Sequence, residues 1–383
     1  MISSNICEIR TSFLESPRGK EVFLSLCCQK ALGFNAALVA IKDAYMAECR
    51  NLGLGADTEV KLQFFFSDIQ NQFALLNAQW QCSPSAFICA VGQAPVEGSY
   101  LVLQAWHLQS KSLKKELLIH QNPFGGIVFH HGGYSSLLTA HFPDADKTTL
   151  EQSGQIIDSY LALLEKNQGH LSKDALRTWF YVRDIDNNYL DMVGARTERY
   201  EQHGLTPKTH FVASTGIEGT SSVPSILSWL LAWTTLGIQP EQRVFISAPS
   251  HLPPTHVYGV NFERATWITF GDRSHIHVSG TASIDAQGNV MHLDDIISQT
   301  YRVAENIRIL LEKGNMSMTD LRSIIVYLRD IGEYPNIAPL LDELFPCVPR
   351  VVVRGAVCRP QWLIEIEGIA GTAQGNSDFA PYC

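Results

Sequence analysis

Three segments of the chain place apolar residues at three- and four-residue spacings, which is the period of an amphipathic helix. They span residues 34–52, 150–166 and 293–313. The first is followed by Gly53, and glycine is a common stop signal at the C-terminal end of a helix. The other two end in the same four residues, Leu-Leu-Glu-Lys. The pattern therefore predicts three long helices, two of which close on a shared sequence.

A strand-like run of large apolar residues follows each predicted helix. Each run ends in the dipeptide Asp-Ile, at Asp68, Asp184 and Asp330. A shorter helix and further strands are predicted after each run, at 70–80, 86–92 and 100–106 in the first copy, 189–203 and 209–215 in the second, and 337–344 and 350–357 in the third. The order helix, strand, helix, strand thus occurs three times.

This internal repeat divides the chain into three predicted units, residues 1–118, 119–238 and 239–383. The shared aspartates are 116 and 146 residues apart, which is the size of a small α+β domain. Chance similarity among common strand–helix patterns is the alternative. It weighs most for the first unit, where Ser67 stands in place of the arginine that precedes the other two aspartates.

The composition is that of a folded protein and excludes several functional classes. Of the 383 residues, 45% are hydrophobic and 17% are charged, which argues against intrinsic disorder. The formal net charge of −9, without any basic run, argues against nucleic acid as a partner. The chain starts without a signal-peptide pattern, and its longest apolar stretch, 226–238, is too short to span a bilayer. We therefore expect a cytoplasmic protein with no membrane partner.

The nine cysteines are an odd number and include no Cys-x-x-Cys pair. This usage is typical of reduced thiols and argues against a disulfide framework or a structural zinc site. Two histidines, His275 and His277, share one face of a predicted strand and could bind a metal, but no third ligand is evident nearby. We therefore predict neither a metal nor a cofactor.

The last unit resembles the RidA/YjgF family from about residue 275 to 370. The resemblance rests on Val278–Asp285, which contains a Ser-Gly step, on Pro349-Arg350, and on the strand Leu363-Ile-Glu-Ile-Glu-Gly. Proteins of that family are trimers with sites between subunits. The resemblance therefore implies an α+β fold of three RidA/YjgF-like units, each a mixed sheet with helices on one face. It also implies that the units form an intramolecular pseudo-trimer, so that the chain is a monomer with pseudo-threefold symmetry.

Four separated motifs, in the same order, resemble the chorismatases more closely. They are Thr178–Asp186, Ala213–Gly219, Val278–Ile284 and Val357–Glu365. Chorismatases act on chorismate and release pyruvate, and they need no metal or redox cofactor. The resemblance covers about residues 175–370 and is weak before residue 120, so it implies no substrate contacts in the first unit.

Glu365 and Glu367 are candidate catalytic groups because they alternate with isoleucines along a predicted strand. They share one face, about 6–7 Å apart. Burial and like-charge repulsion would raise a carboxyl pKa and keep one glutamate protonated near neutral pH, as a general acid requires. Two solvated glutamates on an exposed face are the alternative, and the strand pattern leaves both open. The family resemblance favours the acid role for Glu365.

Cys358 lies seven residues before Glu365, in the predicted turn into the same strand. A lone cysteine is most often a small buried hydrophobe. Chorismatases that form hydroxybenzoate resemble this sequence in having cysteine here, whereas the hydrolytic branch has another residue. The resemblance therefore implies an aromatic product, with Glu365 delivering a proton to the enolpyruvyl methylene.

Chorismate carries two carboxylates, and arginine pairs bidentately with such groups. The candidate substrate-binding residues are Arg183, Arg196, Arg350 and Arg359, together with the hydrogen-bonding residues Tyr189 and Thr215, which the family pattern alone implies. For each arginine, a surface position or a structural ion pair is the alternative.

The leading hypothesis is a chorismatase that forms pyruvate and a hydroxybenzoate, with 3-hydroxybenzoate favoured. Within the family, hydrolysis to a dihydroxycyclohexadienoate or formation of 4-hydroxybenzoate are alternatives. RidA-like imine or enamine hydrolysis is an alternative from another reaction class, and a non-catalytic binder of small carboxylates is a third.

Overall fold

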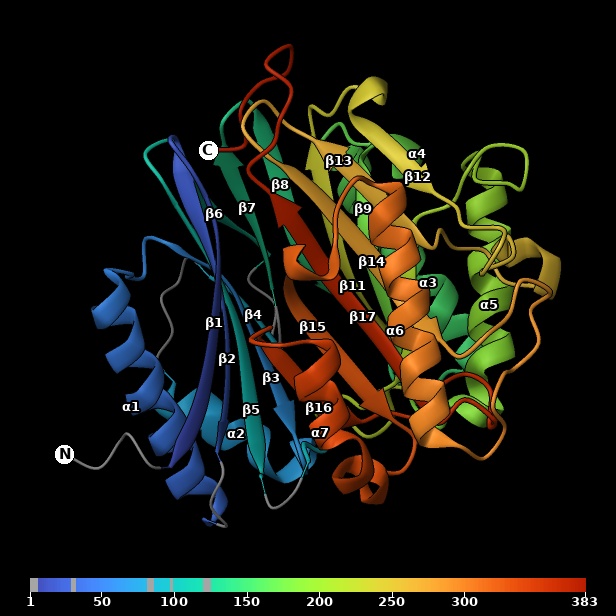
Figure 1. Cartoon of the computed structure of the whole chain (residues 1–383), viewed down its shortest axis with the longest axis horizontal. Coiled ribbons are helices and arrows are strands. Elements are labelled where there is room, and N and C mark those ends of the chain that lie inside the picture. Colours follow the sequence, from blue (N-terminus) through green and yellow to red (C-terminus); the bar gives the residue numbers. More distant parts are fainter. Residues whose placement is uncertain (1–5, 29–31, 81–85, 97–98, 120–124) are drawn as a thin grey trace.

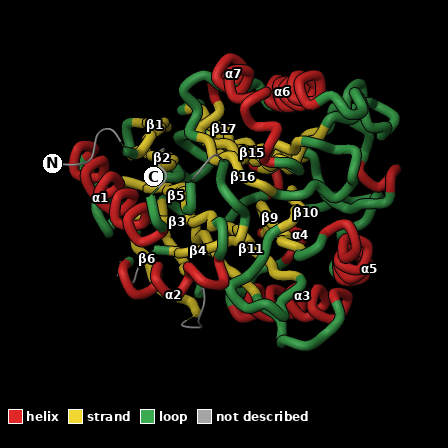
Figure 2. Tube along the Cα trace, turned by 90° about the horizontal axis from the view of Figure 1, so that it is seen from below, coloured by secondary structure: helices red, strands yellow, loops and turns green. Residues whose placement is uncertain are grey.

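The computed structural model describes residues 6–28, 32–80, 86–96, 99–119 and 125–383, and it contains three mixed β-sheets (Figure 1). Seen from below, the sheets lie in the centre and the long helices lie on the periphery, in three groups (Figure 2). The fold is α+β, as the sequence predicts, with three similar units arranged as a pseudo-trimer. None of the helices in the described ranges is long and apolar enough to cross a membrane.

The first sheet has five strands in the order β1-β2-β5-β3-β4. Its elements are β1 (Cys7–Ser16), β2 (Gly19–Cys28), α1 (Phe34–Leu52), β3 (Glu59–Phe66), α2 (Ile69–Gln79), β4 (Phe87–Gly92) and β5 (Leu101–Ser110). Helix α1 ends where the sequence predicts, because Gly53 adopts a left-handed conformation, with φ of 66°, and its amide bonds back to the last turn.

The second sheet repeats this order as β7-β8-β11-β9-β10 and adds β6 beside β7. Its elements are β6 (Lys114–Ile119), β7 (Gly126–His131), β8 (Tyr134–His141), α3 (Thr149–Lys166), α4 (Leu171–Asp174), β9 (Ala175–Val182), α5 (Ile185–Gln202), β10 (Ala213–Glu218) and β11 (Ser228–Leu236).

The third sheet has the order β13-β14-β17-β15-β16 and adds β12 beside β13. Its elements are β12 (Arg243–Ile246), β13 (Ala265–Thr269), β14 (Ser274–Ala282), α6 (Ile296–Lys313), β15 (Leu321–Leu328), α7 (Tyr334–Leu344), β16 (Arg350–Arg354) and β17 (Ile364–Thr372). In each sheet one neighbouring pair is parallel, namely β3–β4, β9–β10 and β15–β16, and the other pairs are antiparallel. The repeat found in the sequence is therefore a repeat of sheet topology.

The shared Asp-Ile dipeptide does not end a strand, as the sequence analysis supposed, but begins the next helical segment. Asp68 and Asp184 are the N-cap residues of α2 and α5, and Asp330 caps a short 3₁₀ turn before α7. Aspartate is favoured at this position because its carboxylate can accept hydrogen bonds from unpaired donors of the first turn. The Asp330 carboxylate accepts one from the Gly332 amide at 2.8 Å. The carboxylates of Asp68 and Asp184 instead accept from the side chains of Asn71 and Asn187.

The predicted strand 209–215 begins later than the sequence indicates. Thr206 and Thr209 form a hydrogen-bonded turn, in which the Thr209 hydroxyl donates to the Gly204 carbonyl at 2.7 Å. Since this turn occupies the start of the segment, strand β10 starts only at Ala213.

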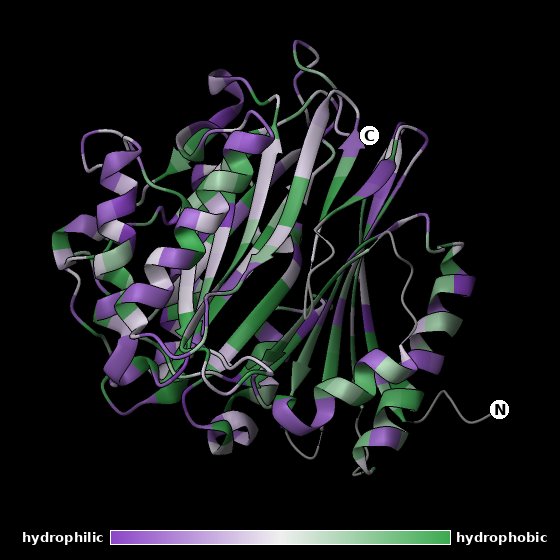
Figure 3. Ribbon diagram, turned by 180° about the vertical axis from the view of Figure 1, so that it is seen from behind, coloured by the Kyte–Doolittle hydropathy of each residue, from purple (hydrophilic) through white to green (hydrophobic). Residues whose placement is uncertain are grey.

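The inner strands are buried on both faces, because one face meets the helices and the other faces the remaining sheets. All eight residues of β9 are buried, and Phe64, Phe65 and Phe66 of β3 are fully enclosed. Hydropathy colouring shows apolar residues along these strands and polar residues on the outer helix faces (Figure 3). Polar side chains that lie among the inner strands therefore stand out as candidates for function.

Candidate active site

A cavity of about 370 Å³ lies between the second and third units. Helix α5 and strand β10 form its wall on the second unit. The third unit contributes β14, β17 and the connecting segments 258–264 and 358–362. Six of the predicted site residues line this cavity, although they come from distant parts of the sequence: Tyr189, Arg196, Thr215, Cys358, Arg359 and Glu365.

Glu365 extends from β17 into the cavity and is only 6% exposed. Burial, and then the charge of Glu367, raise the pKa of its carboxyl to about 8. Its carboxyl makes no hydrogen bond with any residue that the structure describes. Glu365 is therefore protonated at neutral pH and able to donate that proton to a bound molecule.

Glu367 lies on the same face of β17, is 3% exposed and has a different environment. Its carboxylate forms an ion pair with Arg177 at 2.8 Å and accepts a hydrogen bond from Trp179 Nε1 at 2.7 Å. It also accepts a hydrogen bond from the Thr215 hydroxyl. These three donors, all on β9 and β10, compensate its charge, so that Glu367 is the ionised neighbour that helps to keep Glu365 protonated.

Thr215 links this network to the cavity wall. Its hydroxyl donates to Glu367 and accepts hydrogen bonds from Arg177 and from the Gly280 amide, the latter at 2.9 Å. Because its one hydroxyl hydrogen is directed at Glu367, Thr215 acts on Glu365 indirectly, by holding Gly280 and Glu367 in place.

Gly280 is required by close packing against the Glu365 carboxyl. A Cβ atom at position 280 would lie 2.1 Å from Glu365 Oε1, well inside van der Waals contact. The predicted Ser-Gly step of this strand therefore has a specific function, which is to leave room for the buried acid.

The Cys358 thiol and the Tyr189 hydroxyl are hydrogen-bonded partners beside Glu365. Burial, and then the nearby Glu365, raise the pKa of Cys358 to about 12. Burial, followed by the charge of Cys358, also raises the pKa of Tyr189 well above its usual value. Both groups are therefore protonated at neutral pH, and Cys358 is a neutral thiol rather than a thiolate nucleophile.

Three arginines give the cavity a positive wall. Arg196 donates through Nε to Asn261 at 2.6 Å, while its buried Nη2 has no hydrogen-bond partner among the residues that the structure describes. Arg264 donates to the Pro253 carbonyl at 3.0 Å, and Arg359 donates to the Tyr258 carbonyl at 3.4 Å. A buried guanidinium nitrogen without a partner is costly, so the free Nη2 of Arg196 points to an anionic ligand.

Two of the predicted arginines are not brought to this cavity. Arg183 donates through Nη1 to the Pro224 carbonyl, at the rim of the second unit. Arg350 forms an ion pair with Asp342 at 2.7 Å and lines a separate, smaller cavity between the third and first units. Arg183 and Arg350 therefore fit the alternative given for each candidate arginine, which is a surface position or a structural ion pair.

Sequence reasoning missed Arg264 and the aromatic residue Tyr258, over which both Arg264 and Arg359 stack. Arg264 follows Phe262 closely in the sequence and is buried. Arg264 carries the same sequence signal as the other candidate arginines, which is a cation among apolar neighbours. The role of Gly280 had no sequence signal beyond the motif in which it stands.

Comparison with known proteins identifies relatives of the third unit. A family model described as endoribonuclease L-PSP matches residues 269–372, which contain β14 to β17. The chain is 33% identical over 97 residues to 3-aminoacrylate deaminase RutC of Acinetobacter baylyi. The aligned part is 25% of this chain and 77% of that protein.

Among solved structures, a chorismatase matches the whole chain. The match covers 96% of this chain and 100% of that one, with a TM-score of 0.63 and 17% sequence identity. The RidA protein of the Antarctic bacterium Psychrobacter sp. covers 33% of this chain, at 20% identity and a TM-score of 0.29. The full-length match shows the fold, and with it the arrangement of three units in one chain.

Proposed function

The chain belongs to the RidA/YjgF superfamily, and we propose that it is a chorismatase, an enzyme that cleaves chorismate to pyruvate and a hydroxybenzoate. The observation that carries the proposal is a protonated glutamic acid, Glu365, in a cavity that three arginines line. Asp186 also lines this cavity, but its carboxylate is paired with Arg329 at 2.9 Å. This combination suits a dianionic substrate that reacts by accepting a proton. The fold shared with a chorismatase over the full chain supports the same assignment.

The chemistry begins at the enolpyruvyl ether of chorismate. Protonation of its terminal methylene carbon by Glu365 forms a C–H bond and leaves an oxocarbenium ion at the ether carbon. The carboxylates of Glu365 and Glu367 then stabilise this cation through space, in a site of low dielectric constant. The weakened C–O linkage breaks, and the three-carbon unit leaves as pyruvate.

The balance of atoms favours an aromatic product without added water. Chorismate contains the same atoms as pyruvate plus hydroxybenzoate, and aromatisation releases one ring proton, which restores Glu365. Hydrolysis to a dihydrodiol would add one water molecule. We propose 3-hydroxybenzoate as the product, because Cys358 is a neutral thiol beside Glu365 at the position where hydroxybenzoate-forming chorismatases resemble this chain. Departure of pyruvate leaves a cation at the ring carbon that carried the ether, and direct loss of the proton from the hydroxyl-bearing carbon would give 4-hydroxybenzoate. The 3-isomer forms when the hydroxyl oxygen first bonds to the cationic carbon and loses its proton, which gives an epoxide. The bond from that oxygen to its original carbon then breaks as the oxygen takes up a proton, and the carbon that now bears the oxygen loses its hydrogen as a proton.

The substrate carboxylates are proposed to bind the arginine wall. Arg196 has a buried guanidinium nitrogen without a hydrogen-bond partner among the described residues, and Arg264 and Arg359 line the same cavity and stack on Tyr258. A bidentate carboxylate–guanidinium pair fixes orientation as well as charge. Tyr189 is proposed to position the ring through its hydroxyl.

The decisive experiment incubates the purified protein with chorismate, measures pyruvate, and identifies the ring product by chromatography. We expect pyruvate and 3-hydroxybenzoate in equal amounts. No pyruvate above background would refute the proposal, and release of ammonia from imine substrates without chorismate cleavage would favour a deaminase.

A matched pair of variants tests the acid. Glu365→Gln keeps the shape and removes the donated proton, so turnover should fall by about 10²- to 10⁴-fold. Glu198→Gln, on the exposed side of α5, should retain full turnover. Unchanged turnover in Glu365→Gln would remove this residue from the mechanism.

A further inference from the structure

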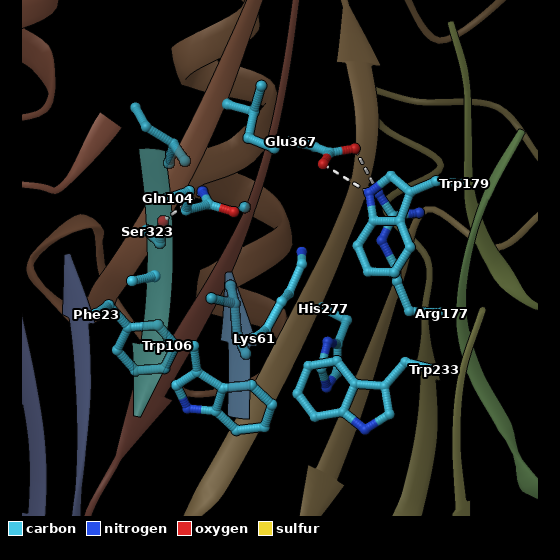
Figure 4. Close-up of a pocket in the computed structure, with 15 residues that line it drawn as sticks. Phe23, Lys61, Gln104, Trp106, Arg177, Trp179, Trp233, His277, Ser323 and Glu367 are labelled. Atoms are coloured by element: carbon cyan, nitrogen blue, oxygen red, sulfur yellow. Dashed lines mark hydrogen bonds and ion pairs between the residues drawn. The ribbon is translucent and has the colours of Figure 1, made fainter. Parts of the chain in front are cut away.

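A second cavity, of about 70 Å³, lies where the three sheets meet. Its walls come from β2, β3 and β5 of the first unit, β9 and β11 of the second, and β14, β15 and β17 of the third. Figure 4 shows its side chains converging from all three sheets. The proposed reaction uses no group in this cavity except Glu367, which closes one end of it.

The polar groups of this cavity occupy equivalent positions in the repeat. Three residues occupy equivalent positions on the equivalent strands β3, β9 and β15, namely Lys61, Arg177 and Ser323. Each of them pairs with the equivalent residue of the neighbouring antiparallel strand. The pairs are Lys61–Trp106, Arg177–Trp233 and Ser323–Ile369. The pseudo-threefold arrangement thus directs two cations and one hydroxyl toward a common point.

The charges in the cavity do not balance. Among the described residues that line it, Glu367 is the one carboxylate, and Glu367 is already paired with Arg177 at 2.8 Å. Lys61 points into the space between the sheets, with its Nζ 5.1 Å from the centre of the Trp179 ring. It forms no ion pair or hydrogen bond with the residues that the structure describes, and burial lowers its pKa. The cavity therefore holds one lysine head group without a counter-ion among the described residues, and an anion beside it would favour its ammonium form.

The remaining wall is mostly apolar, and one hydroxyl on it can donate a hydrogen bond to a small anion. Trp106, Trp179 and Trp233 surround the ammonium with apolar ring surface. The Ser323 hydroxyl accepts a hydrogen bond from Gln104 Nε2 at 2.9 Å, so its own hydrogen is free to donate into the cavity. A buried ammonium without a counter-ion is strongly disfavoured, and a bound anion removes that cost.

We propose that the central cavity binds one monovalent inorganic anion, of the size of chloride or bromide, between the Lys61 ammonium and the Ser323 hydroxyl. The volume of about 70 Å³ is about a fifth of that of the cavity around Glu365, which suits a small ion. The site is separated from the larger cavity by β17 and Thr215, so this inference does not depend on the proposed reaction.

The first test measures the melting temperature in bromide titrations, with gluconate replacing bromide at constant ionic strength. Binding to the folded state raises the melting temperature by about 2 °C for each tenfold increase in bromide above its dissociation constant. We expect this rise in the wild-type protein and in Lys114→Met, an exposed lysine on β6, and its loss in Lys61→Met. An equal rise in Lys61→Met would overturn the proposal.

The second test does not rely on a variant that folds. Crystals of the wild-type protein grown in bromide, measured at the bromine absorption edge, should give one anomalous peak within hydrogen-bond distance of Lys61 Nζ. A cavity without a peak at saturating bromide would show that only water occupies it and would refute the site.

Discussion

The carboxylate of Glu367 pairs with Arg177 at 2.8 Å directly behind the uncharged carboxyl of Glu365, two residues earlier on the same face of β17. One strand thus places two glutamates in different electrostatic environments. The difference arises from their partners, since the donors of β9 and β10 reach Glu367 and stop short of Glu365. The register that pairs β17 with β15 holds both side chains in place.

The pH dependence of turnover should follow the acid form of Glu365. Because burial and Glu367 raise its pKa to about 8, the protonated fraction falls about tenfold per pH unit above that value. We expect kcat/KM for chorismate to be level from pH 6 to 7 and to decline with unit slope above pH 8. A rate profile that stays level to pH 10 would contradict this assignment.

The same shift predicts how stability depends on pH. The folded state holds the Glu365 proton up to pH about 8, whereas the unfolded chain loses it near 4.5. The folded state therefore binds more protons between these values, and the contribution of Glu365 to the free energy of unfolding falls as pH rises from 4.5 to 8. Urea titrations at several pH values measure this dependence. The free energy of unfolding should fall less with rising pH in Glu365→Gln than in the wild-type protein.

Arg177→Met should destabilise the protein because it leaves the Glu367 carboxylate buried without its cation. Removing one partner of a buried ion pair costs about 3–5 kcal/mol. The double variant Arg177→Met/Glu367→Gln removes both charges and should recover much of that loss in denaturant titrations. Additive losses in the double variant would show that the two side chains are not coupled.

Much of the fold could be predicted from the sequence, because each copy of the repeat has the local hydrophobic periodicity of its helices and strands. The helix ending at Gly53 and the strand of Glu365 follow from periodicity and stop signals alone. The hairpin of β1 and β2 lacks such a signal, because its two-residue turn, Pro17-Arg18, does not have the Asn-Gly or Asp-Gly sequence typical of these turns.

The site could be predicted only in part. Glu365 and Cys358 stand close together in sequence, within one motif, and the structure places them in one cavity. Arg183 and Arg350 satisfied the same criterion of a cation among apolar residues, but they meet partners at Pro224 and Asp342 that no sequence pattern reveals. Which cation faces a cavity depends on how the units pack, and that information is absent from any single segment.

Arg196 offers the sharpest test of substrate binding. Arg196→Lys keeps the charge but removes the planar pair of donors, including the free Nη2. A lost charged hydrogen bond is worth about 1.5–3 kcal/mol, so KM for chorismate should rise about 10- to 100-fold. Arg183→Lys, outside the cavity, should leave KM unchanged, and equal effects from both would argue against the arginine wall.

Gly280→Ala should impair the chemical step more than folding. The added methyl group would lie 2.1 Å from Glu365 Oε1, so the carboxyl must move away from the reacting carbon. Displacement of a catalytic group by about 1 Å costs about a hundredfold in rate. Gly194→Ala on α5, whose nearest neighbour is 3.9 Å away, is the matched control and should retain turnover.

Cys358→Ala tests whether the thiol directs the product. The substitution removes the hydrogen-bond partner of Tyr189 and leaves space beside Glu365 that water can enter, while the acid itself is untouched. We therefore expect pyruvate release to continue and the ring product to change from hydroxybenzoate toward the dihydrodiol formed by water attack. Chromatography of the ring product separates the two routes, because the dihydrodiol keeps the ether oxygen and carries two hydroxyl groups, whereas hydroxybenzoate carries one. Unchanged formation of hydroxybenzoate would assign Cys358 a packing role only.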